Sequence, residues 1–262
     1  MCKLEEFFKI LDSRAPIEYS YKCIERGDYD NSGIILKCKD AVSRALFSLD
    51  LSVFAVESAK KKKCDLIVTH HPAIYDPISK LSVEEAFTAA LTNAAVAGIS
   101  VISMHLNLDT AKEGLDHYLA KGLGAKSYKI LDVLEDGGYG REFETEGTLS
   151  EFVKGVKKEF DTERVLFYGN KNDEVKMVAS FCGGGSSHAI RFLREGKISA
   201  DTIVTSDVPH HAIKEIVESG KKLVIVSHYP AEEYGFNRFY EDVKNELNDK
   251  AETLYFCDKR FK

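Results

Sequence analysis

The stretch Asp65-Leu-Ile-Val-Thr-His-His-Pro72 decides how we interpret the fold. Its apolar, partly β-branched run from Leu66 to Val68 is typical of a buried strand, and Pro72 ends the strand because proline donates no ladder hydrogen bond. In an open α/β sheet, ligands bind just beyond the carboxyl ends of the strands. The adjacent His70 and His71 therefore stand where a metal or catalytic site is expected, although a His-His pair taken alone is more often structural.

The chain on both sides of this stretch alternates between strand and helix patterns, which predicts an α/β fold with mixed, mostly parallel sheets. Apolar runs predict strands at residues 34–37, 66–68, 99–104, 128–133, 140–147, 164–167, 177–181, 202–205, 223–226 and 253–256. Amphipathic spacing and capping residues predict helices at residues 1–13, 40–48, 53–63, 82–98, 114–121, 150–160, 189–195, 209–220 and 235–248.

One short stretch recurs, because Asp65-Leu-Ile-Val-Thr69 is echoed by Asp201-Thr-Ile-Val-Thr205. Each copy precedes a predicted helix, a glycine and another apolar strand. Either the similarity is a coincidence between two short apolar strand sequences, or the chain holds two related α/β units. We divide it into a first domain over residues 1–125 and a second over residues 126–262.

Composition narrows the class of protein. The chain has 262 residues, of which 44% are hydrophobic, and its formal net charge of −6 argues against nucleic acid as a partner. Apolar runs are too short to span a membrane, and the acidic amphipathic start does not resemble a signal peptide, so we predict a cytoplasmic protein. The six cysteines form no Cys-x-x-Cys pair, so a zinc ribbon or redox dithiol is not expected.

Histidine and carboxylate residues follow three of the predicted strands. They are His70 with His71, His105 with Asp109, and His228 with Glu232. Imidazole and carboxylate together are the ligand set of hydrolytic zinc, manganese, iron or nickel sites. Two such ions about 3.5–4 Å apart clamp a bridging water and the group that it attacks. No helix is predicted that would bring His105 and Asp109 together.

Two further stretches could contact a substrate. Gly183-Gly184-Gly185 precedes a predicted helix, where backbone N–H groups could cradle a phosphate, or it forms only a tight turn. It lacks the lysine of an ATP-binding P-loop. His210 and His211 begin a helix and are candidate proton donors, or they are a plain solvated helix start.

Several motifs resemble the Nif-three-like dinuclear-metal family, also called the GTP cyclohydrolase I type 2 family. The most specific are Thr69-His70-His71-Pro72, His105-x-x-x-Asp109 and His228-Tyr229-x-x-Glu232. Tyr29-Asp30-Asn31-Ser32-Gly33 looks like the Trp-Asp-Asn-x-Gly signature of that family, with tyrosine in place of tryptophan. Cys182 to Ser186 and Thr205 to His211 resemble two further family blocks.

This resemblance implies two α/β domains with a metal site in the cleft between them, in chains that form ring-shaped hexamers. The metal ligands that it implies are His70, His71, Asp109, His228 and Glu232. His105 would lie beside them, as a ligand or next to the ligands. Two departures are Pro230 inside the His-Tyr-x-x-Glu block and Glu233 next to Glu232, which leaves a ligand shifted by one residue open.

The function implied is a metal-dependent hydrolase with two divalent ions per chain, whose bridging hydroxide attacks a nucleotide or phosphoester. Mixed histidine and carboxylate donors do not distinguish Zn, Fe, Mn and Ni. The alternative is a non-catalytic, oligomeric metal-binding scaffold or a regulatory protein-interaction factor, since that role would keep the same donors.

Overall fold

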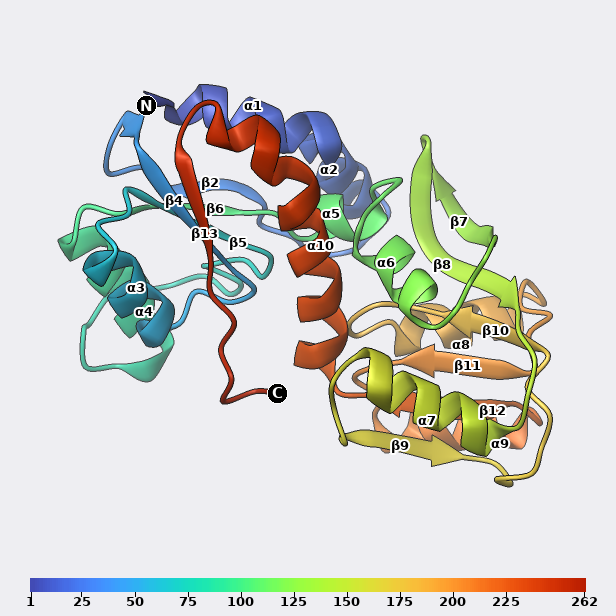
Figure 1. Ribbon diagram of the computed structural model, residues 1–262. Coiled ribbons are helices and arrows are strands. Elements are labelled where there is room, and N and C mark those ends of the chain that lie inside the picture. The colour runs from blue at the N-terminus through green and yellow to red at the C-terminus, as the bar shows by residue number, and fades with distance from the viewer. The chain divides into compact units, whose positions relative to one another are not determined.

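The computed structural model describes residues 1–262, and these divide into two compact units. The first unit comprises Met1–Ala111 and Phe236–Arg260, and the second comprises Lys112–Gly235 and Phe261–Lys262. Each unit is built on its own β-sheet and is described by itself (Figure 1). The predicted α/β fold with mixed, partly parallel sheets is thereby confirmed.

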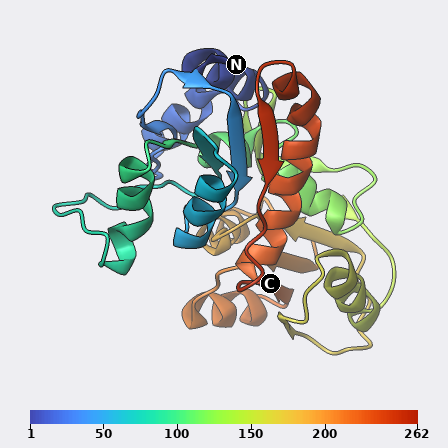
Figure 2. The same ribbon diagram turned by 60° about the vertical axis from the view of Figure 1, so that its left-hand side comes forward.

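The first unit has a five-stranded sheet with the order β13-β4-β5-β6-β2. All of its strands are parallel except β2, which is antiparallel to β6. The strands are β2 (Gly33–Leu36), β4 (Arg44–Ser48), β5 (Leu66–Thr69), β6 (Ser100–Ser103) and β13 (Glu252–Tyr255). Both ribbon views show β13 beside β4 at one edge of this sheet (Figures 1 and 2). Strand β5 lies in the middle and every residue in it is buried, as its unbroken apolar run predicts.

Helices cover both faces of this sheet. The elements are α1 (Leu4–Arg14), α2 (Ile17–Glu25), α3 (Val53–Lys61), α4 (Ala86–Val96) and α5 (Leu106–Thr110), with a small ladder of β1 (Cys2–Lys3) and β3 (Ala41–Val42). On one face, Val56 of α3 and Ala94 of α4 join a core with Ile67. On the other, the ring of Phe47 lies 6.1 Å from that of Phe236, between ring centroids. Successive side chains along a strand point to opposite faces of the sheet, so neighbouring residues pack into the cores on its two sides.

The second unit has a six-stranded sheet with the order β7-β8-β10-β11-β12-β9. Its three inner strands β10, β11 and β12 are parallel, and the outer strands run antiparallel to their neighbours. The strands are β7 (Lys129–Leu134), β8 (Gly137–Glu144), β9 (Val165–Tyr168), β10 (Met177–Ser180), β11 (Thr202–Thr205) and β12 (Lys222–Val226). The helices are α6 (Leu115–Gly122), α7 (Leu149–Glu159), α8 (Ser186–Arg194) and α9 (His210–Glu218).

Apolar side chains and one buried ion pair hold the second unit together. Phe192 of α8 and Ile216 of α9 pack on one face of the sheet against Ile203. Beside β8, Arg141 Nη1 lies 3.0 Å from Asp116 Oδ2, and both side chains are fully buried. Burial raises the pKa of Asp116 to about 6 even though the charge of Arg141 lowers it, so the pair is ionised at neutral pH.

The predicted helices at residues 40–48 and 82–98 differ from the structure. Residues 40–48 form β3 and β4 instead of a helix, because Leu46 and Phe47 are completely buried in a strand paired on both sides. The pairing of β4 with strands β5 and β13 outweighs the helical pattern of the local sequence. Helix α4 begins at Ala86 rather than Ser82, since the Ser82 hydroxyl accepts a hydrogen bond from the Glu84 N–H in the preceding loop.

Helix α10 (His228–Asn248) begins well before the predicted start at residue 235. Pro230 is compatible with this start because the N–H groups of a first helical turn have no partner within the helix. At 21 residues α10 is long, yet neither it nor any other helix is apolar enough to cross a membrane.

The compact units also differ from the predicted division at residue 125. The first continuous segment ends at Ala111, and Phe236–Arg260 returns to the first unit. This return follows from pairing, because β13 adds to the edge of the first sheet beside β4.

Candidate metal centre

The two adjacent histidines leave β5 in a fixed arrangement. The N–H groups of His70 and His71 both donate to the Leu49 carbonyl, each at 3.1 Å. The fully buried His70 ring donates from Nδ1 to the Met104 carbonyl at 2.8 Å. A carbonyl only accepts hydrogen bonds, so His70 carries its proton on Nδ1 and presents Nε2 as a lone-pair donor. His71 Nδ1 lies 2.7 Å from Asp50 Oδ1.

His105 and Asp109 are joined by the single turn of α5. His105 directly precedes the helix, and the Asp109 N–H donates to the His105 carbonyl at 2.8 Å. The expectation that no helix connects them was wrong, because this turn was too short to give a periodic signal. His105 Nδ1 lies 2.7 Å from Asp30 Oδ1.

Asp30 is buried beneath His105 and accepts from further donors. The Ser20 and Ser32 hydroxyls both donate to Asp30 Oδ2, the second at 2.7 Å. Burial raises the pKa of Asp30, but the hydrogen bonds from His105 and the two serines outweigh it, so the pKa lies below its usual value. Asp30 is therefore a carboxylate anion held behind the His105 ring.

The first unit thus gathers one group of candidate metal ligands. Single ligand atoms of His70, His105 and Asp109 all lie within 4.8 Å of one another. His70 Nε2 is 3.6 Å from Asp109 Oδ1, and Asp109 is 5% exposed. The rings of His70 and His71 lie 4.8 Å apart between centroids, so His71 borders the same group.

The second unit pairs His228 with Glu232 on one face of α10. Their spacing of four residues puts His228 Nε2 2.8 Å from Glu232 Oε2, and Asp207 Oδ2 lies 2.6 Å from Nδ1 of the same ring. The charge of Glu232 raises the pKa of His228 to about 11 against a lowering by burial, and Asp207 adds to the rise. In the metal-free protein this histidine is an imidazolium at neutral pH.

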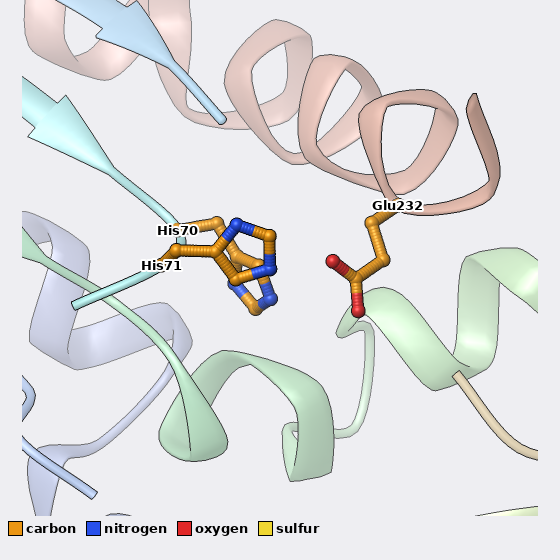
Figure 3. Close-up of side chains that lie close together, drawn as sticks. All are labelled: His70, His71 and Glu232. Atoms are coloured by element: carbon orange, nitrogen blue, oxygen red, sulfur yellow. The ribbon is translucent and has the colours of Figure 1, made fainter. Parts of the chain in front are cut away.

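Glu232 itself lies near the start of α10, and its side chain is almost completely buried. Figure 3 shows the two histidines following β5 and the carboxylate of Glu232 projecting from the early part of α10. Gly183 lies against the same carboxylate, because a Cβ placed on it would come within 2.5 Å of Glu232 Oε1.

The residues present fit divalent metal ions. Metal-binding histidines usually donate their other ring N–H to a carboxylate or backbone carbonyl, which fixes the tautomer and the ring orientation. All four candidate histidines have such a partner at Nδ1: the Met104 carbonyl for His70, Asp50 for His71, Asp30 for His105 and Asp207 for His228. Neutral imidazole with carboxylate suits several first-row transition metals.

Sequence reasoning missed the three carboxylates that hold these rings. Asp30 and Asp207 lie within blocks that were quoted for other reasons. Asp50 gave no signal, since it follows a strand that was predicted as a helix. The proton-donor candidates His210 and His211 are exposed at the start of α9 and are in neither ligand group. Gly183 is near Glu232, whereas Gly184 borders open space.

Comparison with known proteins finds relatives along almost the whole chain. A model of the family Duf34/NIF3 (NGG1p interacting factor 3) matches residues 2–260. A GTP cyclohydrolase 1 type 2 homolog of Clostridium perfringens is 26% identical over 258 residues, which cover 96% of this chain and 95% of that protein. NGG1-interacting factor 3 of Saccharomyces cerevisiae is 26% identical over 282 residues, which cover 96% and 93% respectively.

The fold is also shared with a solved structure. The crystal structure of a hypothetical protein of Staphylococcus aureus has a TM-score of 0.85 at 21% identity, over 97% of this chain and 96% of that chain. Because the family model matches almost every residue, this chain belongs to the Duf34/NIF3 (NGG1p interacting factor 3) family, as its histidine motifs predicted.

Proposed function

We propose that this protein is a metal-dependent hydrolase with a centre of two divalent ions. The ions would be held by His70, His71, Asp109, His228 and Glu232, with His105 beside them. The proposal rests on one observation that all four histidines share. Each ring has a carbonyl or carboxylate oxygen within hydrogen-bond distance of its Nδ1 atom. Such a partner fixes the orientation of a metal-binding histidine ring.

The protein's own groups suit hydrolytic chemistry. Bound divalent ions act as Lewis acids and lower the pKa of a water molecule toward about 7. Asp109 and Glu232 are almost completely buried carboxylates, and their negative charge would offset that of the ions. Positive charge on the ions would in turn favour the neutral form of His228, which is needed for ligation.

The substrate we propose is a nucleotide or another phosphoester. Support comes from relatives named GTP cyclohydrolase 1 type 2 homolog and from the glycine turn at Gly183 beside Glu232. Gly184 borders open space in that turn, where a phosphate could approach the backbone.

Turnover tests the proposal. Metal-loaded protein is incubated with GTP and with a generic phosphodiester, alongside Glu232→Ala and the adjacent Glu233→Ala as a matched control. We expect hydrolysis by the wild type and by Glu233→Ala, and its loss in Glu232→Ala. Equal activity in all three would indicate a contaminant and remove the support for hydrolysis.

A regulatory scaffold is the second candidate, since one relative carries the name NGG1-interacting factor 3. That role would retain bound metal without turnover of any substrate tested. Metal binding with no hydrolysis in the experiment above would therefore favour the scaffold over the hydrolase.

We further propose that the chain assembles with itself into a ring of six. Light scattering after size-exclusion chromatography should then give a mass about six times that of one chain. A clean monomer at micromolar concentration would contradict the ring.

A further inference from the structure

We propose that Asp30 is a positioning residue that makes His105 a metal ligand through Nε2. This inference rests on the proposed metal centre and deepens it, because it assigns His105 a role that sequence reasoning had left open. It also gives a function to the Tyr29-Asp30-Asn31-Ser32-Gly33 block, which supplies no candidate ligand of its own.

The first step of the argument is the contact itself. His105 Nδ1 lies 2.7 Å from Asp30 Oδ1, and the Asp30 side chain is fully buried. A carboxylate anion accepts hydrogen bonds and cannot donate one, so the proton of a neutral His105 ring resides on Nδ1. Nε2 is then the ring nitrogen that keeps its lone pair, and His105 belongs to the candidate ligand group with His70 and Asp109.

The second step is that Asp30 is itself fixed in place. The hydroxyls of Ser20 on α2 and of Ser32 in the loop before β2 both donate to Asp30 Oδ2. Its other oxygen is left for His105. Every donor to this carboxylate thus comes from a side chain that the surrounding structure holds.

The third step is that the same serines hold the backbone of the α5 turn. The His105 N–H donates to Ser32 Oγ at 3.0 Å, and the Asn107 N–H donates to Ser20 Oγ at 3.0 Å. Each serine therefore accepts from the turn while it donates to Asp30. Because α5 also carries Asp109, the network positions two candidate ligands at once.

The carboxylates that contact the other histidines are more exposed to solvent than Asp30. The side chain of Asp50, which contacts His71, is 37% exposed, and that of Asp207, which contacts His228, is 69% exposed. Water can replace those contacts when the carboxylate is removed. Asp30 is shielded, so its removal leaves the Nδ1 proton of His105 without a ready acceptor.

The experiment reads the tautomer of His105 in metal-free protein by ¹⁵N NMR of labelled histidine at mildly alkaline pH. The His105 signal is assigned from its loss in His105→Gln. We expect the Nδ1–H form in the wild type and in Asp30→Asn, whose amide oxygen still accepts. Asp30→Ala should shift His105 toward the Nε2–H form, while the matched control Asp50→Ala should leave it unchanged.

A second readout is the affinity for Co²⁺, followed by its visible absorption. Loss of such a partner typically costs about 10–100-fold in metal affinity, so Asp30→Ala should weaken binding by that factor and Asp30→Asn by less. An Nε2–H tautomer in the metal-free wild type would overturn the proposal outright, whether or not any variant folds. If the tautomer is as expected but no Co²⁺ binds, the proposed metal centre fails, and with it the role of His105 as a ligand, while the orientation of the His105 ring by Asp30 stands.

Discussion

A histidine binds metal most readily when its ring is held in place before the ion arrives. At His228, the neighbouring charges that hold the ring also favour its protonated form. The pKa of His228 is raised to about 11, chiefly by the charge of Glu232. A proton and a metal ion therefore compete for the same Nε2 atom. The second unit holds an imidazolium–carboxylate pair, and a metal ion would have to displace its proton.

Substitution of Glu232 tests this competition. The folded pKa of His228 lies above its unfolded value of about 6.5, so the protonated ring stabilises the metal-free fold below that pH, and this stability is lost as the pH rises through about 11. Glu232→Gln should lower the pKa of His228 and move that loss to lower pH. NMR titration of the ring measures it, and Glu233→Gln, which changes the neighbouring charge, should have a smaller effect.

The buried pair of Arg141 and Asp116 predicts a second effect. Removing one partner leaves the other as an uncompensated buried charge, so Asp116→Ala should lower the free energy of unfolding by about 3–5 kcal/mol. The double variant Asp116→Leu with Arg141→Met should lose less than either single change. Chemical denaturation gives the values, and simple additivity of the two losses would contradict the pairing.

At the scale of elements, three local features carry the candidate ligands: the strand end after β5, the one-turn helix α5, and the first turns of α10. The strand end was predictable because a short apolar run followed by proline is a strong signal. Helix α5 was not, since five residues carry no periodicity. The early start of α10 was hidden by Pro230, which breaks a helix interior but is tolerated in a first turn.

The glycine turn before α8 gives a prediction at this scale. Gly183 has φ = +58°, and a Cβ there would lie 2.5 Å from Glu232 Oε1. Gly183→Ala should therefore displace the Glu232 carboxylate, weaken metal binding about tenfold or more and cost about 1–2 kcal/mol of backbone strain.

Gly184→Ala is the matched control, because no atom lies within 4 Å of a Cβ at that position. Co²⁺ titration and denaturation of the two variants compare them directly. Equal losses in both would show that the turn does not support Glu232.

At the scale of the whole molecule, sequence predicted the α/β class but not how the chain is shared between the units. The return of residues 236–260 to the first unit depends on β13 pairing with β4, a contact across some 200 residues that no local pattern encodes. The carboxylates behind the histidines were missed for the same reason. His105 and Asp30 are 75 residues apart in sequence and meet only in the folded unit.

The metal content of protein purified without chelator, with its His70→Ala and His228→Ala variants, tests the central claim most directly. The account predicts up to two divalent ions per chain in the wild type and loss of most of the metal in both variants, while His211→Ala keeps it. A metal-free wild type under metal-replete conditions, or full metal content in His228→Ala, would contradict it.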